Sequence, residues 1–210
     1  MFGLVNYSVF IVSAILLNLT PGNDTMYILA RSISSGRKAG ILSALGISLG
    51  CIVHTILASL GLSVILAKSA LVFDIVKYLG TAYLIYLGIR SLQAKSQETQ
   101  PKNNGVSYDS YKIFFQGALT NVLNPKVALF FLAFLPHFVD LNNTYGMLPF
   151  LLLGFTFVFT GTIWCLALAI FSAHFAGKFN KNMVTSKWLK RISGVIYIGL
   201  GLNLLRAKLM

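Results

Sequence analysis

Six apolar runs dominate this chain, and each approaches the length that a helix needs to cross a lipid bilayer. A helix of about 20 apolar residues spans the hydrocarbon core of a membrane. The runs lie at residues 4–30, 40–67, 71–89, 113–139, 147–176 and 189–205. They predict an all-α integral membrane protein with six transmembrane helices.

The scarcity of charged residues agrees with this and excludes a soluble enzyme. Only 10% of the 210 residues are charged and 56% are hydrophobic, whereas an average soluble domain is about 25% charged. We therefore expect a protein that is not an enzyme. No Gly-rich loop ends in Gly-Lys-Ser or Gly-Lys-Thr, so we expect no bound ATP and no other cofactor. If the protein moves a solute, an ion gradient or the solute's own gradient must drive it.

Positive charge is concentrated in alternate loops. The net charge is +12, and basic residues crowd the loops around residues 31–38, 90–112 and 178–191, whereas residues 139–149 contain none. Cytoplasmic loops of membrane proteins carry an excess of Lys and Arg, so these three loops should be cytoplasmic and both termini should lie outside. The charge therefore indicates topology and contact with the lipid bilayer, and it does not predict a nucleic-acid partner.

The longest polar stretch divides the chain into two halves of three helices each. Residues 93–112 are rich in Gln, Lys, Ser and Asn and predict a cytoplasmic linker. Residues 1–92 form the first half and residues 113–210 the second. Because three is an odd number, the second half would enter the membrane from the opposite side, which predicts two inverted three-helix repeats.

Each half opens with a proline inside a polar cluster that does not belong in a bilayer. The first cluster, residues 18–25, reads Asn-Leu-Thr-Pro-Gly-Asn-Asp-Thr, and the second, residues 120–126, reads Thr-Asn-Val-Leu-Asn-Pro-Lys. Each proline removes a backbone donor, which frees the carbonyls of Leu17 and Asn121 from their helical partners. Broken backbone at membrane depth is tolerated where it is buried in protein or lines a wet cavity. We therefore expect transmembrane helices 1 and 4 to be broken.

Broken helices at corresponding positions of two inverted repeats are typical of the central site of a transporter. The alternative is that each proline produces a kink with a packing role only. The transporter interpretation predicts a substrate site formed by residues of both clusters. These residues are Asn18, Thr20, Pro21, Gly22, Asn23, Asp24, Asn121, Asn124, Pro125 and Lys126.

Asp24 and Lys126 are the charged members of the two clusters. A charge deep in a spanning helix costs about 2.5–3.5 kcal/mol on insertion scales, so each should face the interior and have a partner, and the two can partner each other. Asp24 is either a proton or ammonium site or an interfacial carboxylate at the cytoplasmic end of a long first helix. His54 shares a small-residue face with Gly46 and Gly50, and it serves either in proton coupling or as a structural hydrogen-bond donor.

A zwitterion suits these groups. The carboxylate of an amino acid would bind at the N-terminal end of a half-helix or at Lys126, and its ammonium at the freed carbonyls or at Asp24. Proton and substrate would then compete for Asp24, so that a proton entering from outside releases the substrate or resets the site.

The motifs of this chain resemble those of a known transporter family nearly from end to end. The matching features are Thr20-Pro21-Gly22 followed by Asp24, Gly-Arg-Lys-Ala-Gly at 36–40, Gly46, Gly50, Gly80, Tyr83, Leu84, Gly88, Asn124-Pro125-Lys126, Leu-Pro-His-Phe at 135–138, and Gly194 with Gly201. In these features the chain resembles the LysE/RhtB family of bacterial amino-acid exporters, whose members include homoserine, threonine and lysine exporters.

The resemblance implies a multi-pass protein of the bacterial inner membrane that exports small amino acids of the homoserine or threonine kind. It also implies coupling to proton entry and a homo-oligomer, and the outward termini would then be periplasmic. The family usually has Pro-Gly-Pro where this chain has Pro21-Gly22-Asn23. Asn23 restores a backbone donor and adds a side-chain amide at the first break.

Two other functions remain open at this point. A transmembrane thiol-redox carrier would use Cys51 and Cys165, which occupy the second helices of the two halves, although neither is close to Pro21 or Pro125 in the sequence. A divalent-metal permease would use acidic and histidine side chains without recognisable ligand spacing, so we expect no metal site. Those side chains are Asp24, His54, His137 and His174.

Overall fold

A computed structural model describes residues 2–68, 70–93, 109–140 and 142–174, together with residues 191, 195, 198, 199 and 202. These residues are helical apart from short connections, which confirms the all-α prediction for this part of the chain. The elements are α1 (Tyr7–Leu19), α2 (Asn23–Lys68), α3 (Ala70–Gln93), α4 (Ser110–Val122), α5 (Pro125–Leu129), the π-helix η1 (Phe130–Phe134), the 3-10 helix η2 (Leu135–Phe138) and α6 (Leu148–His174).

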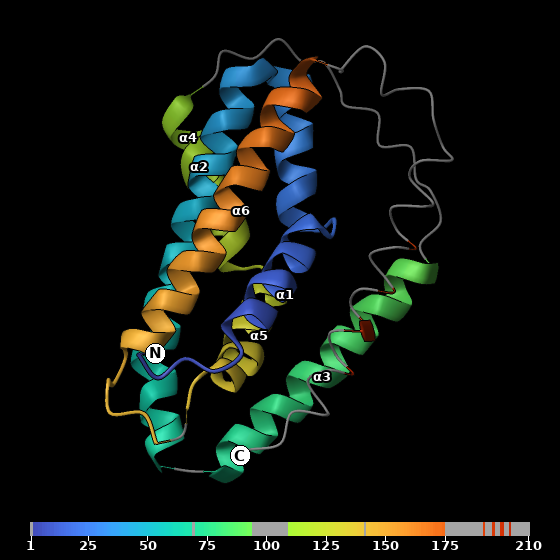
Figure 1. Ribbon diagram of the computed structural model, residues 1–210. Helices are drawn as coiled ribbons and strands as arrows, with labels where there is room; N and C mark the ends of the chain where they lie inside the picture. The colour runs from blue at the N-terminus through green and yellow to red at the C-terminus, as the bar shows by residue number, and fades with distance from the viewer. Residues whose placement is uncertain are drawn as a thin grey trace.

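Helix α2 turns back on itself at Gly36. The backbone there is not helical, with φ 81° and ψ 177°, a conformation open to glycine because it has no Cβ. A Cβ on Gly40 would collide with Ser32 Oγ across this turn. Figure 1 shows α2 rising to one end of the bundle and descending again. Residues 23–35 therefore complete the first predicted span, and residues 37–68 form the second.

Three segments within the described residues have the length and composition of membrane spans. They are Asn23–Gly61, Leu148–Ser172 and, as one span bent by 46°, Ser110–Val122 with Pro125–Phe138. The first of these has 39 residues, which is more than one crossing needs, and the turn inside α2 divides it. The predicted sixth helix, 189–205, and most of the predicted linker, 93–112, lie outside the described residues.

Large apolar side chains point outward from α6. Phe155, Phe159 and Phe171 are 50%, 67% and 62% exposed. Apolar surface of this extent needs an apolar covering, and in a helix of 27 residues the hydrocarbon core of a bilayer supplies it. The chain is therefore a multi-pass membrane protein.

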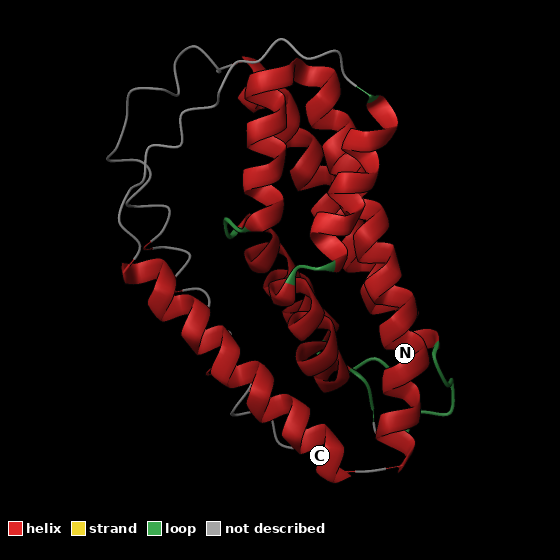
Figure 2. Cartoon of the chain, turned by 180° about the vertical axis from the view of Figure 1, so that it is seen from behind, coloured by secondary structure: helices red, strands yellow, loops and turns green. Residues whose placement is uncertain are grey.

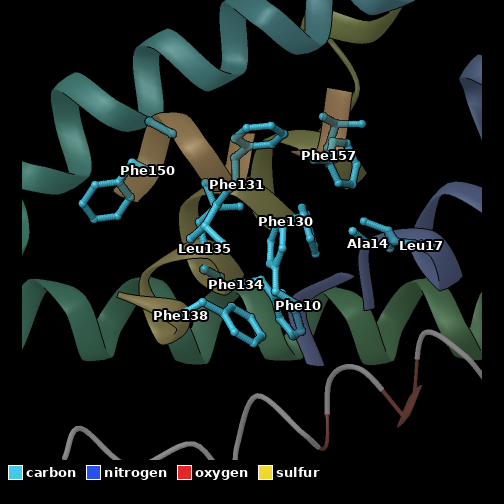
Figure 3. Close-up of a cluster of buried hydrophobic side chains, with 14 of the residues drawn as sticks. Phe10, Ala14, Leu17, Phe130, Phe131, Phe134, Leu135, Phe138, Phe150 and Phe157 are labelled. Atoms are coloured by element: carbon cyan, nitrogen blue, oxygen red, sulfur yellow. The ribbon is translucent and has the colours of Figure 1, made fainter. Parts of the chain in front are cut away.

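An aromatic cluster joins α1, η1, η2 and α6 beside the helix breaks, as Figure 3 shows. The ring centroid of Phe130 lies 4.8 Å from that of Phe157 and 5.0 Å from that of Phe134. The rings of Phe10 and Phe138 are 5.2 Å apart, edge to face. Such pairs add about 0.5–1.5 kcal/mol beyond the burial of their area. The cluster therefore holds α1 against the segment that follows the second break.

Glycines allow α2 and α4 to pack backbone against backbone. A Cβ on Gly46 would collide with the carbonyl oxygen of Phe114, and one on Gly50 would lie 2.8 Å from the carbonyl oxygen of Ala118. Small residues permit this close approach between membrane helices. The predicted small-residue face of α2 therefore packs inside the protein, and His54, one turn further on, is buried with it.

Helices α2 and α6 touch in a reciprocal pattern. The hydroxyls of Ser48 and Thr162, which are 114 residues apart, lie 2.7 Å from each other. The same offset of 114 residues relates Gly40 of α2 to Gly154 of α6, and Thr55 of α2 to Ala169 of α6. Gly40 packs against Ala169, and Gly154 packs against Thr55. Each contact therefore has a counterpart in which the two helices exchange roles. This is the pattern expected for two antiparallel helices related by a two-fold axis.

Candidate functional site

The chain is broken at both predicted positions. Residues 20–22 separate α1 from α2, and residues 123–124 separate α4 from α5. Figure 2 shows both breaks as short loops within the helical bundle. The breaks also meet, because Lys126 Nζ lies 3.6 Å from the position that a Cβ would take on Gly22. The prediction that transmembrane helices 1 and 4 are broken is confirmed.

Lys126 stabilises the end of α1. Its Nζ donates hydrogen bonds of 2.9 Å to three acceptors, the carbonyl oxygens of Leu17 and Thr20 and the hydroxyl of Thr20. The Leu17 carbonyl is the one that Pro21 was expected to free. Three acceptors match the three donors of an ammonium group, and these bonds do not include Asp24. Lys126 also interacts electrostatically with Asp24, and their pairing stays a prediction.

His54 donates to a carbonyl at the second break, as Lys126 does at the first. Its Nε2 lies 3.1 Å from the carbonyl oxygen of Asn121, which Pro125 was expected to free. Since a carbonyl oxygen only accepts, Nε2 is the donor. The ring also stacks on Phe131, with centroids 5.8 Å apart. His54 therefore makes the structural hydrogen bond, and its part in proton coupling stays a prediction.

Asp24 lies in the first turn of α2, directly after the first break. Its Oδ2 accepts a hydrogen bond of 2.8 Å from Asn121 Nδ2. Its Oδ1 is buried and has no hydrogen-bond partner among the described residues. A carboxylate is stabilised at a helix N-terminus by the helix dipole. A new helix starts here, so Asp24 lies at the break between α1 and α2, and its role as a proton or ammonium site stays a prediction.

A small, partly open cavity of about 40 Å³ lies beside the two breaks. Five of the predicted site residues line it: Asn18, Gly22, Asp24, Asn124 and Lys126. Thr20 and Asn121 lie behind this wall, where they bond to Lys126 and Asp24. Pro21, Asn23 and Pro125 shape the breaks without lining the cavity. The structure thus brings the two predicted clusters together around one space.

Helix α6 forms a wall of the cavity that the sequence analysis missed. Its contribution includes Phe157, Gly161, Thr162 and Trp164, and Val158 adds further apolar surface. The polar run Thr-Gly-Thr at 160–162 in an otherwise apolar span is the signal that could have found this wall. The span has no charged residue, and its one proline, Pro149, lies in its first turn, so neither of these signals points to residues 160–162.

Both cysteines also line the cavity, Cys51 from α2 and Cys165 from α6. Both cysteines are distant from Pro21 and Pro125 in the sequence, but the fold brings them to the cavity beside the breaks. The reason is that α2 and α6 cross at Ser48 and Thr162, one turn before each cysteine. The structure has both as free thiols.

Three buried polar atoms of cavity residues lack hydrogen-bond partners among the described residues. They are Asp24 Oδ1, an acceptor, and Asn124 Nδ2 and Trp164 Nε1, which are donors. The side chain of Asn124 nevertheless interacts with the carboxylate of Asp24, so these two residues partly satisfy each other. Within the described part of the chain, no three His, Cys, Asp or Glu side chains come together as a metal site would require.

Comparison with known proteins places this chain in a family. Residues 15–208 match the family described as LysE type translocator. The chain is 36% identical over 202 residues to the uncharacterized membrane protein YrhP of Bacillus subtilis (strain 168), which covers 92% of this chain and 95% of that protein. It is 29% identical over 207 residues to the leucine efflux protein of Enterobacter sp. (strain 638), with 97% and 96% coverage. No solved structure matches it. Because the family match extends over nearly the whole chain, this protein belongs to the LysE type translocator family.

Proposed function

We propose that this protein exports small amino acids across a bacterial inner membrane, and that the substrate binds in the cavity between the two helix breaks. The observation that carries the proposal is the carboxylate of Asp24 in the cavity wall, at the point where the two helix breaks meet. A carboxylate at membrane depth requires a cationic or donor partner. An amino acid supplies an ammonium group, and relatives from Enterobacter and Klebsiella are leucine efflux proteins.

The other walls of the cavity favour an aliphatic side chain. Ile47, Val127, Phe157 and Val158 line it with apolar surface. Ser48 donates to the carbonyl of Ala44, so Thr162 is the donor in its bond with Ser48, and both hydroxyl donors are already used. A leucine-like substrate therefore fits these walls better than the homoserine or threonine that the sequence alone suggests.

Transport then requires the cavity to open alternately to the two sides. At the side that the basic loops place in the cytoplasm, Tyr27 donates a hydrogen bond of 2.9 Å to the carbonyl of Ile113. Arg31 donates one of 2.7 Å to Gln116 Oε1. These bonds tie the first arm of α2 to α4, and we expect them to break when the substrate loads. The reciprocal contacts of α2 and α6 support two inverted units that move against each other.

Proton coupling follows from the position of Asp24. A proton bound at its carboxylate removes the charge that holds the substrate ammonium, so proton and substrate exclude each other. A proton moving inward gains about 2.3 kcal/mol per 100 mV of membrane potential. That free energy biases the transport cycle toward export. The basic loops, which we expect in the cytoplasm, place both termini in the periplasm.

The test is leucine efflux from cells loaded with a leucine-containing dipeptide. Asp24→Asn keeps the size of the side chain and an acceptor for Asn121 but removes the charge, so we expect efflux to fall to the level of cells without the protein. Asp109→Asn, at an exposed helix cap, is the control and should leave efflux unchanged. Undiminished efflux by Asp24→Asn at normal expression would exclude this site.

The position of both cysteines in the cavity keeps the thiol-redox carrier as a second candidate. The variant with Cys51→Ser and Cys165→Ser separates the two functions, because serine retains the size of the wall and cannot exchange electrons. An amino-acid exporter should retain its leucine efflux in this variant. Loss of efflux in this variant, at a normal level of folded protein, would favour the redox carrier.

A further inference from the structure

The segment before α1 is paired with the segment that follows η2. Leu4 and Val139 form an isolated antiparallel bridge, and two backbone hydrogen bonds flank it. These bonds run from the N–H of Val5 to the carbonyl of Phe138 and from the N–H of Asp140 to the carbonyl of Gly3, both at 2.9 Å. Residues 2–5, which we call the clasp, therefore join the start of the first transmembrane helix to the end of the fourth.

Side-chain contacts secure the clasp. The ring of Phe2 meets that of Tyr145 edge to face, with centroids 6.0 Å apart. Gly3 packs so closely on Asn143 that a Cβ would collide with its side chain, and Leu4 packs against the aromatic cluster. The backbone of Phe2 lies at φ 50°, a region that bulky side chains rarely adopt. The clasp is therefore held by its contacts and not by the preference of its own backbone.

Four phenylalanine rings fill the space between the clasp and the cavity, as Figure 3 shows. Successive centroids are 5.1, 5.0 and 4.8 Å apart along the series Phe138, Phe134, Phe130 and Phe157. None of these side chains is more than 5% exposed, and Phe157 also lines the cavity. No polar cargo passes toward the clasp while these rings stay packed. Because the clasp bonds to the backbone of Phe138, it fixes the outer end of this series.

The first and fourth transmembrane helices are thus tied together on both sides of the cavity. On the side of the basic loops, Tyr27 bonds to the carbonyl of Ile113. The clasp forms the other tie, and Figure 1 shows the N-terminus at the end of the bundle opposite the turn of α2. The cavity between the ties, about 40 Å³, has room for about three water molecules. A larger cargo therefore requires the helices to separate at one tie or the other.

We propose that the clasp is the gate on the side opposite the basic loops, and that its release from residues 138–140 opens the cavity to that side. This inference rests on the proposed transport function and names an element that regulates it. Release breaks two backbone hydrogen bonds whose donors, Val5 and Asp140, are exposed residues, so water replaces the lost partners. Phe138 and Phe134 then move away from the cavity with the end of the fourth helix.

A disulfide across the bridge tests this proposal. Leu4 and Val139 are a pair without hydrogen bonds between them, and the Cα atoms of such antiparallel pairs lie about 4.5 Å apart, which a disulfide can span. The variant with Leu4→Cys and Val139→Cys is reconstituted in proteoliposomes, and exchange of radiolabelled leucine is measured after oxidation and again after reduction. We expect oxidation to lower the exchange rate at least tenfold and reduction to restore it. The two single variants, oxidised and reduced in the same way, are the controls and should show no such change.

Access to Cys165 tests the clasp without reference to any cargo. In Cys51→Ser the remaining thiol lines the cavity, and a membrane-impermeant maleimide is added to each side of sealed vesicles in turn. Val5→Pro removes the N–H that donates to Phe138, whereas Val5→Ala keeps it. We expect Val5→Pro to raise the labelling rate about fivefold, as expected for the loss of one hydrogen bond, and only from the side opposite the basic loops. Val5→Ala is the matched control and should leave the rate unchanged.

The outcomes separate this inference from the function on which it rests. If the wild type exchanges neither leucine nor any other amino acid, the proposed function fails, and the labelling of Cys165 still decides the role of the clasp. If leucine is exchanged and the disulfide, verified by mass, does not slow it, the gate assignment alone is overturned. Equal labelling rates in Val5→Pro and Val5→Ala would overturn it as well.

Discussion

The ammonium group of Lys126 lies 2.9 Å from the carbonyl oxygen of Leu17, the group that Pro21 deprives of its helical partner. The second break has the same arrangement, with His54 Nε2 at 3.1 Å from the carbonyl of Asn121. In both cases the donor and the carbonyl belong to different halves of the chain. Each carbonyl also accepts a local bond, from Thr20 at the first break and from the Asn124 N–H at the second. Broken backbone persists in a membrane interior where its polar groups have partners, and the two side chains add one partner to each break.

Removal of the ammonium group should destabilise the protein. In Lys126→Met the Leu17 carbonyl keeps its hydrogen bonds from Thr20 but loses a charged donor, as do the two oxygens of Thr20. A hydrogen bond to a charged group contributes about 1.5–3 kcal/mol. We expect a lower free energy of unfolding and a lower Tm in detergent, together with loss of leucine efflux. Lys112→Met, at an exposed position of α4, is the control. A Tm equal to that of the wild type would contradict the role assigned to Lys126.

Substitutions of His54 should separate hydrogen bonding from titration. His54→Gln retains an N–H that can donate to the carbonyl of Asn121, whereas His54→Leu does not. If the role is structural, Gln should preserve efflux and Leu should reduce it about tenfold, as expected for the loss of one hydrogen bond; the carbonyl of Asn121 keeps the bond from the Asn124 N–H. The measurement is efflux at several external pH values. Equal inactivation by both substitutions would instead assign proton coupling to the imidazole.

The packing of α2 on α4 should not tolerate a methyl group at Gly46. A Cβ there collides with the backbone carbonyl of Phe114, which cannot rotate away. Overpacking of this kind costs about 1–3 kcal/mol, so Gly46→Ala should lower the Tm. Gly61→Ala on the same helix is the matched control, because a Cβ there meets nothing within 4 Å. Equal Tm values for Gly46→Ala and Gly61→Ala would contradict this prediction.

Substrate should protect the cavity cysteines from alkylation. In Cys51→Ser the remaining Cys165 still lines the cavity, and bound leucine would occupy the space through which N-ethylmaleimide must reach its thiol. We expect the labelling rate to fall as leucine is added and to stay constant with an equal concentration of sucrose. Labelling that leucine does not slow would place the substrate elsewhere.

The helix breaks were predictable because their cause is local. Proline lacks an N–H wherever it stands, so the positions of Pro21 and Pro125 predict both interruptions and name the two carbonyls that lose partners. The polar character of the surrounding residues also predicts that the breaks face inward. The family resemblance rests on the same local motifs, and the family match confirms it.

The partners of these groups were not predictable, because they depend on how distant helices cross. The crossing of α2 and α6 at Ser48 and Thr162 brings Trp164 and both cysteines to the breaks. The turn at Gly36 returns α2 past α4, so that His54 meets Asn121. Sequence spacing describes one helix at a time, whereas the wall of the cavity comes from contacts among α1, α2, α5 and α6 that only the packed structure specifies.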